Sequence, residues 1–237
     1  AMLVKSNKSI GFRLGVNGVF GNFGVAAAPL ITGLLLTIGD WQLCFIIPGL
    51  FCIGYGVAFA MALKDDADDT SKPRVSAAES FAPNWKRALA VLALSTASGG
   101  FIFGAMTFIV PRYFEISMVS LSTSVAVTGL LAAVVYAVAS FSQIAVGWLI
   151  DRYSPRNVLI IMAIGQVIFI YLAAQFNNLA LFFAMLLAMS FVFGQIPITD
   201  AILSRYVPDV WRARVFSLTF MLNFSIGASV LPPCGVI

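Results

Sequence analysis

The chain has 237 residues, of which 60% are hydrophobic and only 10% are charged, and its net charge is +4. A soluble domain carries roughly a quarter charged residues, so this composition excludes an ordinary water-facing surface and indicates a polytopic membrane protein. Three scattered cysteines exclude a disulfide scaffold, and the lack of any histidine excludes a histidine-based zinc or acid–base site.

Uncharged stretches of about 20 residues, the length of a membrane-spanning helix, follow one another along the chain. Arg13 and Asp40 enclose the first stretch, and Asp40 and Lys64 enclose the second. The stretch from Arg156 to Asp200 is long enough for two helices, with a break at the polar residues Gln175, Asn177 and Asn178. The predicted fold class is therefore an all-α polytopic helical membrane protein with spans near 14–38, 41–63, 88–110, 122–149, 157–175, 179–203 and 214–236.

All but one of the 14 Lys and Arg residues fall on the same side of these spans, and Arg112 is the exception. Cytoplasmic loops of membrane proteins carry such an excess of basic residues. This side is therefore predicted to be cytoplasmic, and it includes the start of the chain and the loop 64–87. The asymmetry explains the net positive charge without a nucleic-acid partner. The 64–87 loop itself is mixed in charge and typical of a solvated linker, which we favour over a phosphate or metal site at its acidic run.

A shift of 201 residues aligns the first span with the last. It places Arg13 on Arg214 and Asn22 on Asn223, and it also pairs Phe23 with Phe224 and Ala27 with Ala228. Both segments begin with a basic residue on the predicted cytoplasmic side and run in the same direction. Parallel repeats of this kind occur in transporters.

The fourth span leads into the segment Gly147-Trp-Leu-Ile-Asp151-Arg152-Tyr-Ser-Pro-Arg156. It resembles the signature loop of the major facilitator superfamily, Gly-x-x-x-Asp-Arg-x-Gly-x-Arg, with Ser154 in place of the second Gly. The resemblance implies that the seven spans are helices five to eleven of a twelve-helix bundle. Residues 1–63 would end the N-terminal half, 64–87 would form the central cytoplasmic loop, and 88–237 would belong to the C-terminal half. The sequence would then be a piece of a longer chain that does not transport by itself.

The physical chemistry of this loop can be read from its residues. Gly147 allows a neighbouring helix to approach closely, and Asp151 can meet the positive N-terminus of an adjacent helix or a nearby Arg. We predict that Gly147, Asp151, Arg152 and Arg156 form a gating latch on the cytoplasmic side. The alternative is an ordinary basic loop in which Asp151 pairs only with Arg152.

The first span contains Gly24-x-x-x-Ala28-Pro29-x-x-Thr32-Gly33. This element resembles the Gly-x-x-x-Gly-Pro-x-x-Gly-Gly motif of helix five in exporters of the same superfamily, from which it departs at Ala28 and Thr32. Pro29 can bend the span, and Gly24 and Gly33 permit close packing. A helix that serves packing alone and an exporter-specific helix both fit the residues. Glycines with Pro111 in the third span, and Gly194 with Pro197 in the sixth, predict further bends.

Polar side chains at mid-depth are few, and such groups usually face a cavity or a partner helix. In the superfamily fold, helices five, seven, eight, ten and eleven line the central cavity, and the candidates fall on those five helices. The resemblance thus implies a substrate site formed by Asn22, Ser95, Tyr136, Gln143, Gln195 and Asn223, with Ser98 nearby. Hydrogen bonding between helices is the alternative role. Asp200, about one turn before Arg205, is predicted to belong to a charge network at the gate, and the alternative role is that of a proton carrier.

The sequence therefore predicts a secondary transporter that moves a small molecule by alternating access, either coupled to protons or as an efflux antiporter. No cofactor, metal or nucleic acid is expected, and the protein is expected to be a monomer in the bacterial cytoplasmic membrane. One alternative is a seven-helix receptor or retinal protein, but its N-terminus would lie outside and the last span lacks the Schiff-base Lys. A membrane-embedded enzyme is the other alternative, and it would need a base that a chain without histidine lacks.

Overall fold

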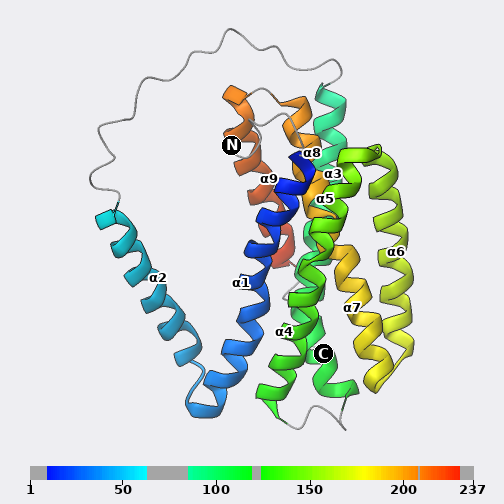
Figure 1. The fold of residues 1–237 in the computed structure, drawn as a ribbon. Coiled ribbons are helices and arrows are strands. Elements are labelled where there is room, and N and C mark those ends of the chain that lie inside the picture. The colour runs from blue at the N-terminus through cyan, green and yellow to red at the C-terminus, as the bar shows by residue number, and fades with distance from the viewer. Residues whose placement is uncertain (1–9, 63–84, 119–123, 208, 230–237) are drawn as a thin grey trace.

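A computed structural model describes residues 10–62, 85–118, 124–207 and 209–229, which form nine helices (Figure 1). No strand occurs among these residues. The helices are α1 (Ile10–Ile38), α2 (Leu43–Ala62), α3 (Trp85–Ser117), α4 (Val125–Ser140), α5 (Ser142–Arg152), α6 (Pro155–Gln175), α7 (Asn178–Gly194), α8 (Ile196–Tyr206) and α9 (Asp209–Ser229). The prediction of an all-α membrane bundle is confirmed.

Two of the spans are interrupted in the middle. Phe141 separates α4 from α5, and Gln195 separates α7 from α8. Pro197 follows the second break within the first turn of α8, where a missing N–H does little harm. The hydroxyl of Ser142 donates to the carbonyl oxygen of Ser190 at 2.7 Å and so joins the two spans near their breaks. The bend predicted from Gly194 and Pro197 therefore takes the form of a break at Gln195.

Six stretches of the described residues are long and apolar enough to cross a membrane, and they match the first six predicted spans. The seventh prediction, 214–236, overlaps α9, but residues 230–236 lie outside the described part of the chain. The third span is longer than predicted, because α3 continues without a break through Pro111 to Ser117. The break near Gln175 is confirmed, and Asn178 there has a φ of 53°, a conformation that Asn tolerates better than most residues.

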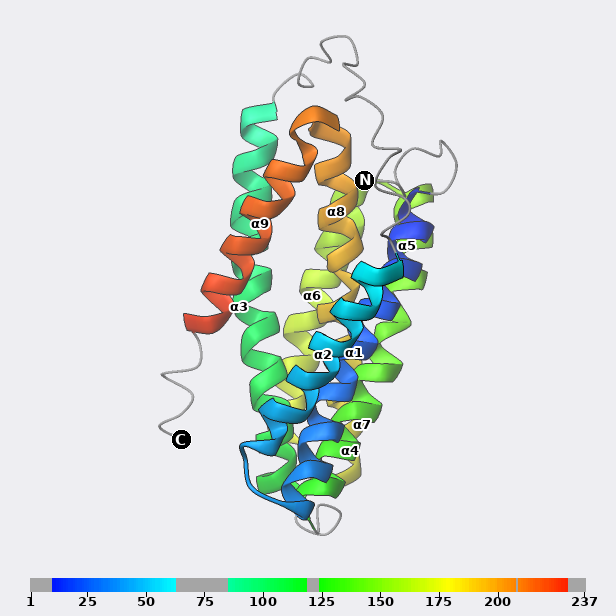
Figure 2. The same cartoon turned by 90° about the vertical axis from the view of Figure 1, so that its left-hand side faces the viewer.

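The two ends of the bundle differ in charge. We call the end that carries Arg13, Arg87, Arg152, Arg156 and Arg214 the basic end. The helices α1, α3, α6 and α9 begin there, and α2, α5 and α8 end there (Figure 2). The other end of the bundle is called the opposite end.

The core forms where α4 and α7 cross between the other helices. Tyr136, Phe193 and Phe114 are fully buried there, and the rings of Tyr136 and Phe193 lie 6.0 Å apart. The helix α1 packs along α4 and α5, α3 packs against α9, and α6 packs against α7. The helix α2 joins α1 at the opposite end and diverges from it toward the basic end (Figure 1). It is apolar throughout and buries none of its residues, as expected of a helix that faces lipid.

Candidate functional site

The N-terminus of α1 meets the C-terminal end of α5 at the basic end. The backbone N–H groups of Gly11 and Phe12 donate to the two carboxylate oxygens of Asp151, at 2.8 and 2.9 Å. The first N–H groups of a helix have no partner within it and form the positive end of its dipole. Asp151 therefore caps α1 by hydrogen bonds and by charge, and this is one of the two contacts that the sequence predicted for it.

This contact requires that α1 and α5 approach each other closely. A Cβ atom on Gly147 would overlap the carbonyl oxygen of Gly11 and lie 3.2 Å from the Cα of Phe12. A Cβ atom on Gly11 would lie 2.9 Å from Oδ1 of Asp151. Both positions therefore need glycine if the backbone of α1 is to reach the carboxylate.

The other residues of the signature loop have separate roles. The guanidinium of Arg152 lies 3.9 Å above the ring centroid of Trp148, a cation–π contact. The backbone N–H of Tyr153 closes α5 by donating to the carbonyl oxygen of Leu149 at 2.8 Å, and Arg156 is exposed in the first turn of α6. No ion pair between Asp151 and Arg152 occurs in the described part of the chain. The structure therefore does not match the alternative of an ordinary basic loop in which Asp151 pairs only with Arg152.

The glycines of α1 pack unequally. A Cβ atom on Gly33 would lie 2.9 Å from the carbonyl oxygen of Val125, and one on Gly129 would overlap the carbonyl oxygen of Pro29. Gly24 is exposed, and a Cβ atom there would meet nothing within 4 Å. Pro29 and Gly33 thus form the contact of α1 with α4, whereas Gly24 adds no close approach among the described residues.

Four polar side chains are buried with atoms that have no hydrogen-bond partner in the described part of the protein. They are Asn22, Thr96, Gln143 and Gln166, on α1, α3, α5 and α6. Each lies roughly 9 to 12 residues from the basic end of its helix, about 14 to 18 Å at 1.5 Å per residue, which is the middle of a hydrocarbon core about 30 Å thick. We call these residues, together with Gln195, the polar layer. Unpaired polar groups in such surroundings are costly, so the polar layer can offer hydrogen bonds to a ligand.

Gln143 lies at the start of α5, where this helix contacts α1. It is fully buried, and neither its amide nitrogen nor its amide oxygen has a partner in the described residues. A Cβ atom on Gly18 would overlap its Oε1. Asn22, which is 6% exposed, follows Gly18 by one helical turn and therefore lies on the same face of α1. The two amides are thus neighbours along one helix contact.

Gln195 stands at the break between α7 and α8. Its Nε2 donates to Oε1 of Gln166 at 2.5 Å, and its Oε1 lies 3.8 Å from a Cβ atom built on Gly99 of α3. Gln166, on α6, is not among the predicted substrate-binding residues. The structure brings it into the interior as the partner of Gln195.

Asn223 and Ser95 belong to a different contact, between α3 and α9. Asn223 is half-buried, and its Cα lies 3.0 Å from a Cβ atom built on Gly100. Ser95 is also half-buried, whereas Ser98 is exposed and its hydroxyl donates to the carbonyl oxygen of Leu94. Although Asn22 and Asn223 are related by the repeat, they pack against different helices.

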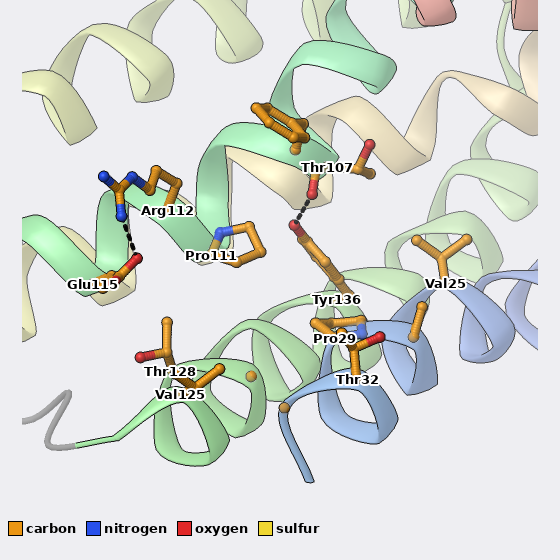
Figure 3. Close-up of a pocket in the computed structure, with 14 residues that line it drawn as sticks. Val25, Pro29, Thr32, Thr107, Pro111, Arg112, Glu115, Val125, Thr128 and Tyr136 are labelled. Atoms are coloured by element: carbon orange, nitrogen blue, oxygen red, sulfur yellow. Dashed lines mark hydrogen bonds and ion pairs between the residues drawn. The ribbon is translucent and has the colours of Figure 1, made fainter. Parts of the chain in front are cut away.

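A cavity of about 750 Å³ lies between α1, α3 and α4, toward the opposite end (Figure 3). Its wall is mostly apolar, and the hydroxyl of Tyr136 donates there to the carbonyl oxygen of Thr107 at 3.0 Å. Arg112 and Glu115, both about half exposed, also line it and form an ion pair of 2.7 Å. Of the predicted substrate-binding residues, only Tyr136 lines this cavity.

Asp200 is half-buried on α8, on the basic side of the polar layer. The predicted charge network of Asp200 with Arg205 lies outside the described residues, because the structure does not describe the side chain of Arg205.

Sequence reasoning missed Thr96, Thr107 and the pair Arg112–Glu115. Thr96 has the same mid-span position as Ser95 and could have been found by that signal. Thr107 contributes a backbone carbonyl oxygen, which no residue pattern marks. Arg112 was used only as the single basic residue on its side of the membrane, yet it lines the cavity.

Comparison with known proteins gives one match. The family model of the Major Facilitator Superfamily matches residues 3–232. Searches of curated proteins and of solved structures gave no match.

Proposed function

The chain belongs to the major facilitator superfamily, and from this membership we propose that it moves a small molecule by secondary active transport with alternating access. The superfamily is a family of membrane transporters, not of enzymes, and the protein is an integral multi-pass membrane protein.

One arrangement carries this proposal. The basic end is held together by the contact of Asp151 with the N-terminus of α1, while the cavity lies toward the opposite end. The polar layer lies between the two. A transporter that alternates between two openings needs a closed end, an open end and a binding site at mid-depth. We therefore assign the structure to a state that is closed at the basic end.

Within the proposed site, Gln143 and Asn22 are the residues most suited to bind substrate. Gln143 follows Tyr136 by two turns, and Asn22 precedes Val25 by about one turn; both therefore lie nearer the basic end than these two cavity-lining residues. A substrate that moved inward from the cavity would meet two amides with free donors and a free acceptor. The predicted set that also includes Gln195, Ser95 and Asn223 would be completed by movements of α3, α8 and α9 during the transport cycle.

Gln143→Leu is expected to reduce transport while leaving the protein at least as stable. Loss of a hydrogen bond to substrate costs about 1–2 kcal/mol, or roughly 5- to 30-fold in affinity. Removal of an unpaired buried amide should raise the thermal midpoint of unfolding, since that amide is costly in the free protein. Transport is measured in proteoliposomes with the complete protein, first across a broad panel of small molecules and then with the substrate found.

The matched control is Gln175→Leu, because Gln175 is exposed at the end of α6. Equal KM and kcat for Gln143→Leu and the unmodified protein would remove Gln143 from the site. A loss of stability in Gln143→Leu would show that its role is structural. Failure of the complete protein to transport any member of the panel would count against the proposed function itself.

We propose that the basic end faces the cytoplasm, in the bacterial cytoplasmic membrane, and that the protein acts as a monomer. The distribution of Lys and Arg supports this orientation. A compartment-sensitive reporter inserted after residue 75 is expected to report the cytoplasm, and Arg112→Cys in a cysteine-free background is expected to react with an impermeant thiol reagent from outside. The reversed pattern would overturn the orientation.

A further inference from the structure

Two prolines line the cavity between α1, α3 and α4, and each removes a backbone donor from its wall. In an α-helix the N–H of one residue donates to the carbonyl oxygen four residues before it, and proline has no N–H. Pro111 of α3 therefore leaves the carbonyl oxygen of Thr107 without its helical donor, and Pro29 of α1 does the same to Val25. All four residues line the cavity (Figure 3).

The hydroxyl of Tyr136 takes the place of the missing N–H at Thr107. Its oxygen lies 3.0 Å from the Thr107 carbonyl oxygen, and the side chain reaches this group of α3 from α4 (Figure 3). Since a carbonyl oxygen only accepts, the hydroxyl is the donor. A carbonyl oxygen has two lone pairs, and a hydroxyl oxygen can also accept. The pair of Tyr136 and Thr107 can therefore accept a further hydrogen bond, but it has no proton left to donate.

Two other hydroxyl groups of the wall also donate their protons to the main chain. The hydroxyl of Thr107 lies 2.7 Å from the carbonyl oxygen of Phe103, and that of Thr128 lies 3.1 Å from the carbonyl oxygen of Ser124. Because each hydroxyl has a single proton, neither can donate to a ligand in this arrangement. Thr32, the other threonine of the described wall, is exposed. The deeper hydroxyl groups thus offer a ligand no donor.

The two charged residues of the described wall compensate each other. Nη1 of Arg112 donates to Oε2 of Glu115 at 2.7 Å, and both side chains are about half exposed. The pair carries one charge of each sign, so it favours neither an anion nor a cation. A charged ligand would also lose hydration against a wall that is otherwise mostly apolar. The cavity therefore favours an uncharged ligand.

We propose that the cavity binds an uncharged, mostly apolar molecule with an O–H or N–H group that donates to the pair of Tyr136 and Thr107. A molecule of the same shape that can only accept would direct its lone pairs at the oxygen atoms of this pair. One neutral hydrogen bond distinguishes two such molecules by about 5-fold in Kd. The volume of about 750 Å³ suits a drug-sized ligand. That the bound molecule is also transported rests on the proposed function.

Carbazole and dibenzofuran test this preference, because they share one tricyclic shape and carry an N–H group and an ether oxygen at the same ring position. Calorimetric titration of the complete protein in detergent, corrected for the partition of each ligand into protein-free micelles, gives the two values of Kd. We expect carbazole to bind about 5-fold more tightly than dibenzofuran. Equal binding, tighter binding of dibenzofuran or binding of neither would overturn the proposal. Tighter binding of the charged fluorene-9-carboxylate would overturn it as well.

Tyr136→Phe locates the acceptor. It keeps the ring but leaves the Thr107 carbonyl oxygen without its donor, so the N–H of carbazole can take that place, and the preference for carbazole should rise by about a further 5-fold. In the double variant Tyr136→Phe/Pro111→Ala, residue 111 again has an N–H for this carbonyl oxygen, and the increase should disappear. Tyr171→Phe is the matched control, because it changes an exposed tyrosine on α6, and it should leave the preference unchanged.

An equal loss of affinity for both ligands in Tyr136→Phe would show that Tyr136 serves packing alone, and it would overturn the proposed contact. If Tyr136→Phe fails to fold, the comparison of the two ligands on the unmodified protein still decides the proposal. Donor-selective binding without transport of any molecule in proteoliposomes would keep the ligand class and reject the proposed function. Transport restricted to charged or acceptor-only molecules would keep the proposed function and reject the ligand class.

Discussion

Alanine at position 147 is expected to separate α1 from α5 and to lower the stability of the protein markedly. The new Cβ would overlap a backbone carbonyl oxygen, which cannot swing away as a side chain could. Insertion of a methyl group into a tight contact costs about 1–3 kcal/mol. The gain in helix propensity from Gly to Ala is up to about 1 kcal/mol, so the net effect is unfavourable.

The control for Gly147→Ala is Gly24→Ala. Gly24 is also a helical glycine, so the propensity gain is the same, but its Cβ would meet nothing within 4 Å. We expect the thermal midpoint of the purified protein to fall by several degrees in Gly147→Ala and to stay the same or rise in Gly24→Ala. Equal midpoints in the two variants would show that the close approach at Gly147 is not required.

Asn in place of Asp151 is expected to open the basic end. Asn can still accept one hydrogen bond from α1, but it loses the second acceptor and the negative charge that faces the helix N-terminus. Hydrogen bonds to a charged group contribute about 1.5–3 kcal/mol, and solvent at this partly exposed site reduces that value. A remaining difference of about 1–2 kcal/mol shifts the ratio of open to closed states roughly 5- to 30-fold.

This shift can be measured through a cysteine at position 14. Leu14 of α1 packs against the buried cluster that contains Val146 and Ile150 of α5. In a background without the three native cysteines, a thiol reagent applied at the basic end should modify Leu14→Cys faster by that factor when Asp151→Asn is present. Asp40→Asn is the control, because it removes an exposed carboxylate at the opposite end. Unchanged reactivity together with unchanged transport would leave Asp151 as a helix cap without a gating role.

These two variants separate two parts of one contact. Gly147→Ala changes the distance between the helices without changing any charge, and Asp151→Asn changes the charge without adding volume. If the contact works as a latch, both should raise the reactivity of Leu14→Cys, the first by lost packing and the second by lost hydrogen bonding and charge.

The sequence by itself determined the features that depend on one helix at a time. Charge positions marked the ends of six spans, because a charged side chain in hydrocarbon is costly. Uncharged polar residues, not charges, marked the break near Gln175, where α6 ends and α7 begins. The roles of Gly147 and Asp151 were also accessible, since a small residue and a carboxylate at a helix end each have few possible partners.

The choice of partners was decided only by the tertiary structure. Gly24 and Gly33 look alike in the sequence, yet only Gly33 packs closely against another helix. Asn22 and Asn223 occupy equivalent repeat positions, but Asn223 packs against α3, whereas α1, which carries Asn22, packs along α4 and α5. The pairing of Gln166 with Gln195 was also not readable in advance. The physical reason is that these helices are apolar on all sides: lipid and protein interior accept the same side chains, so periodicity alone does not show which face turns inward.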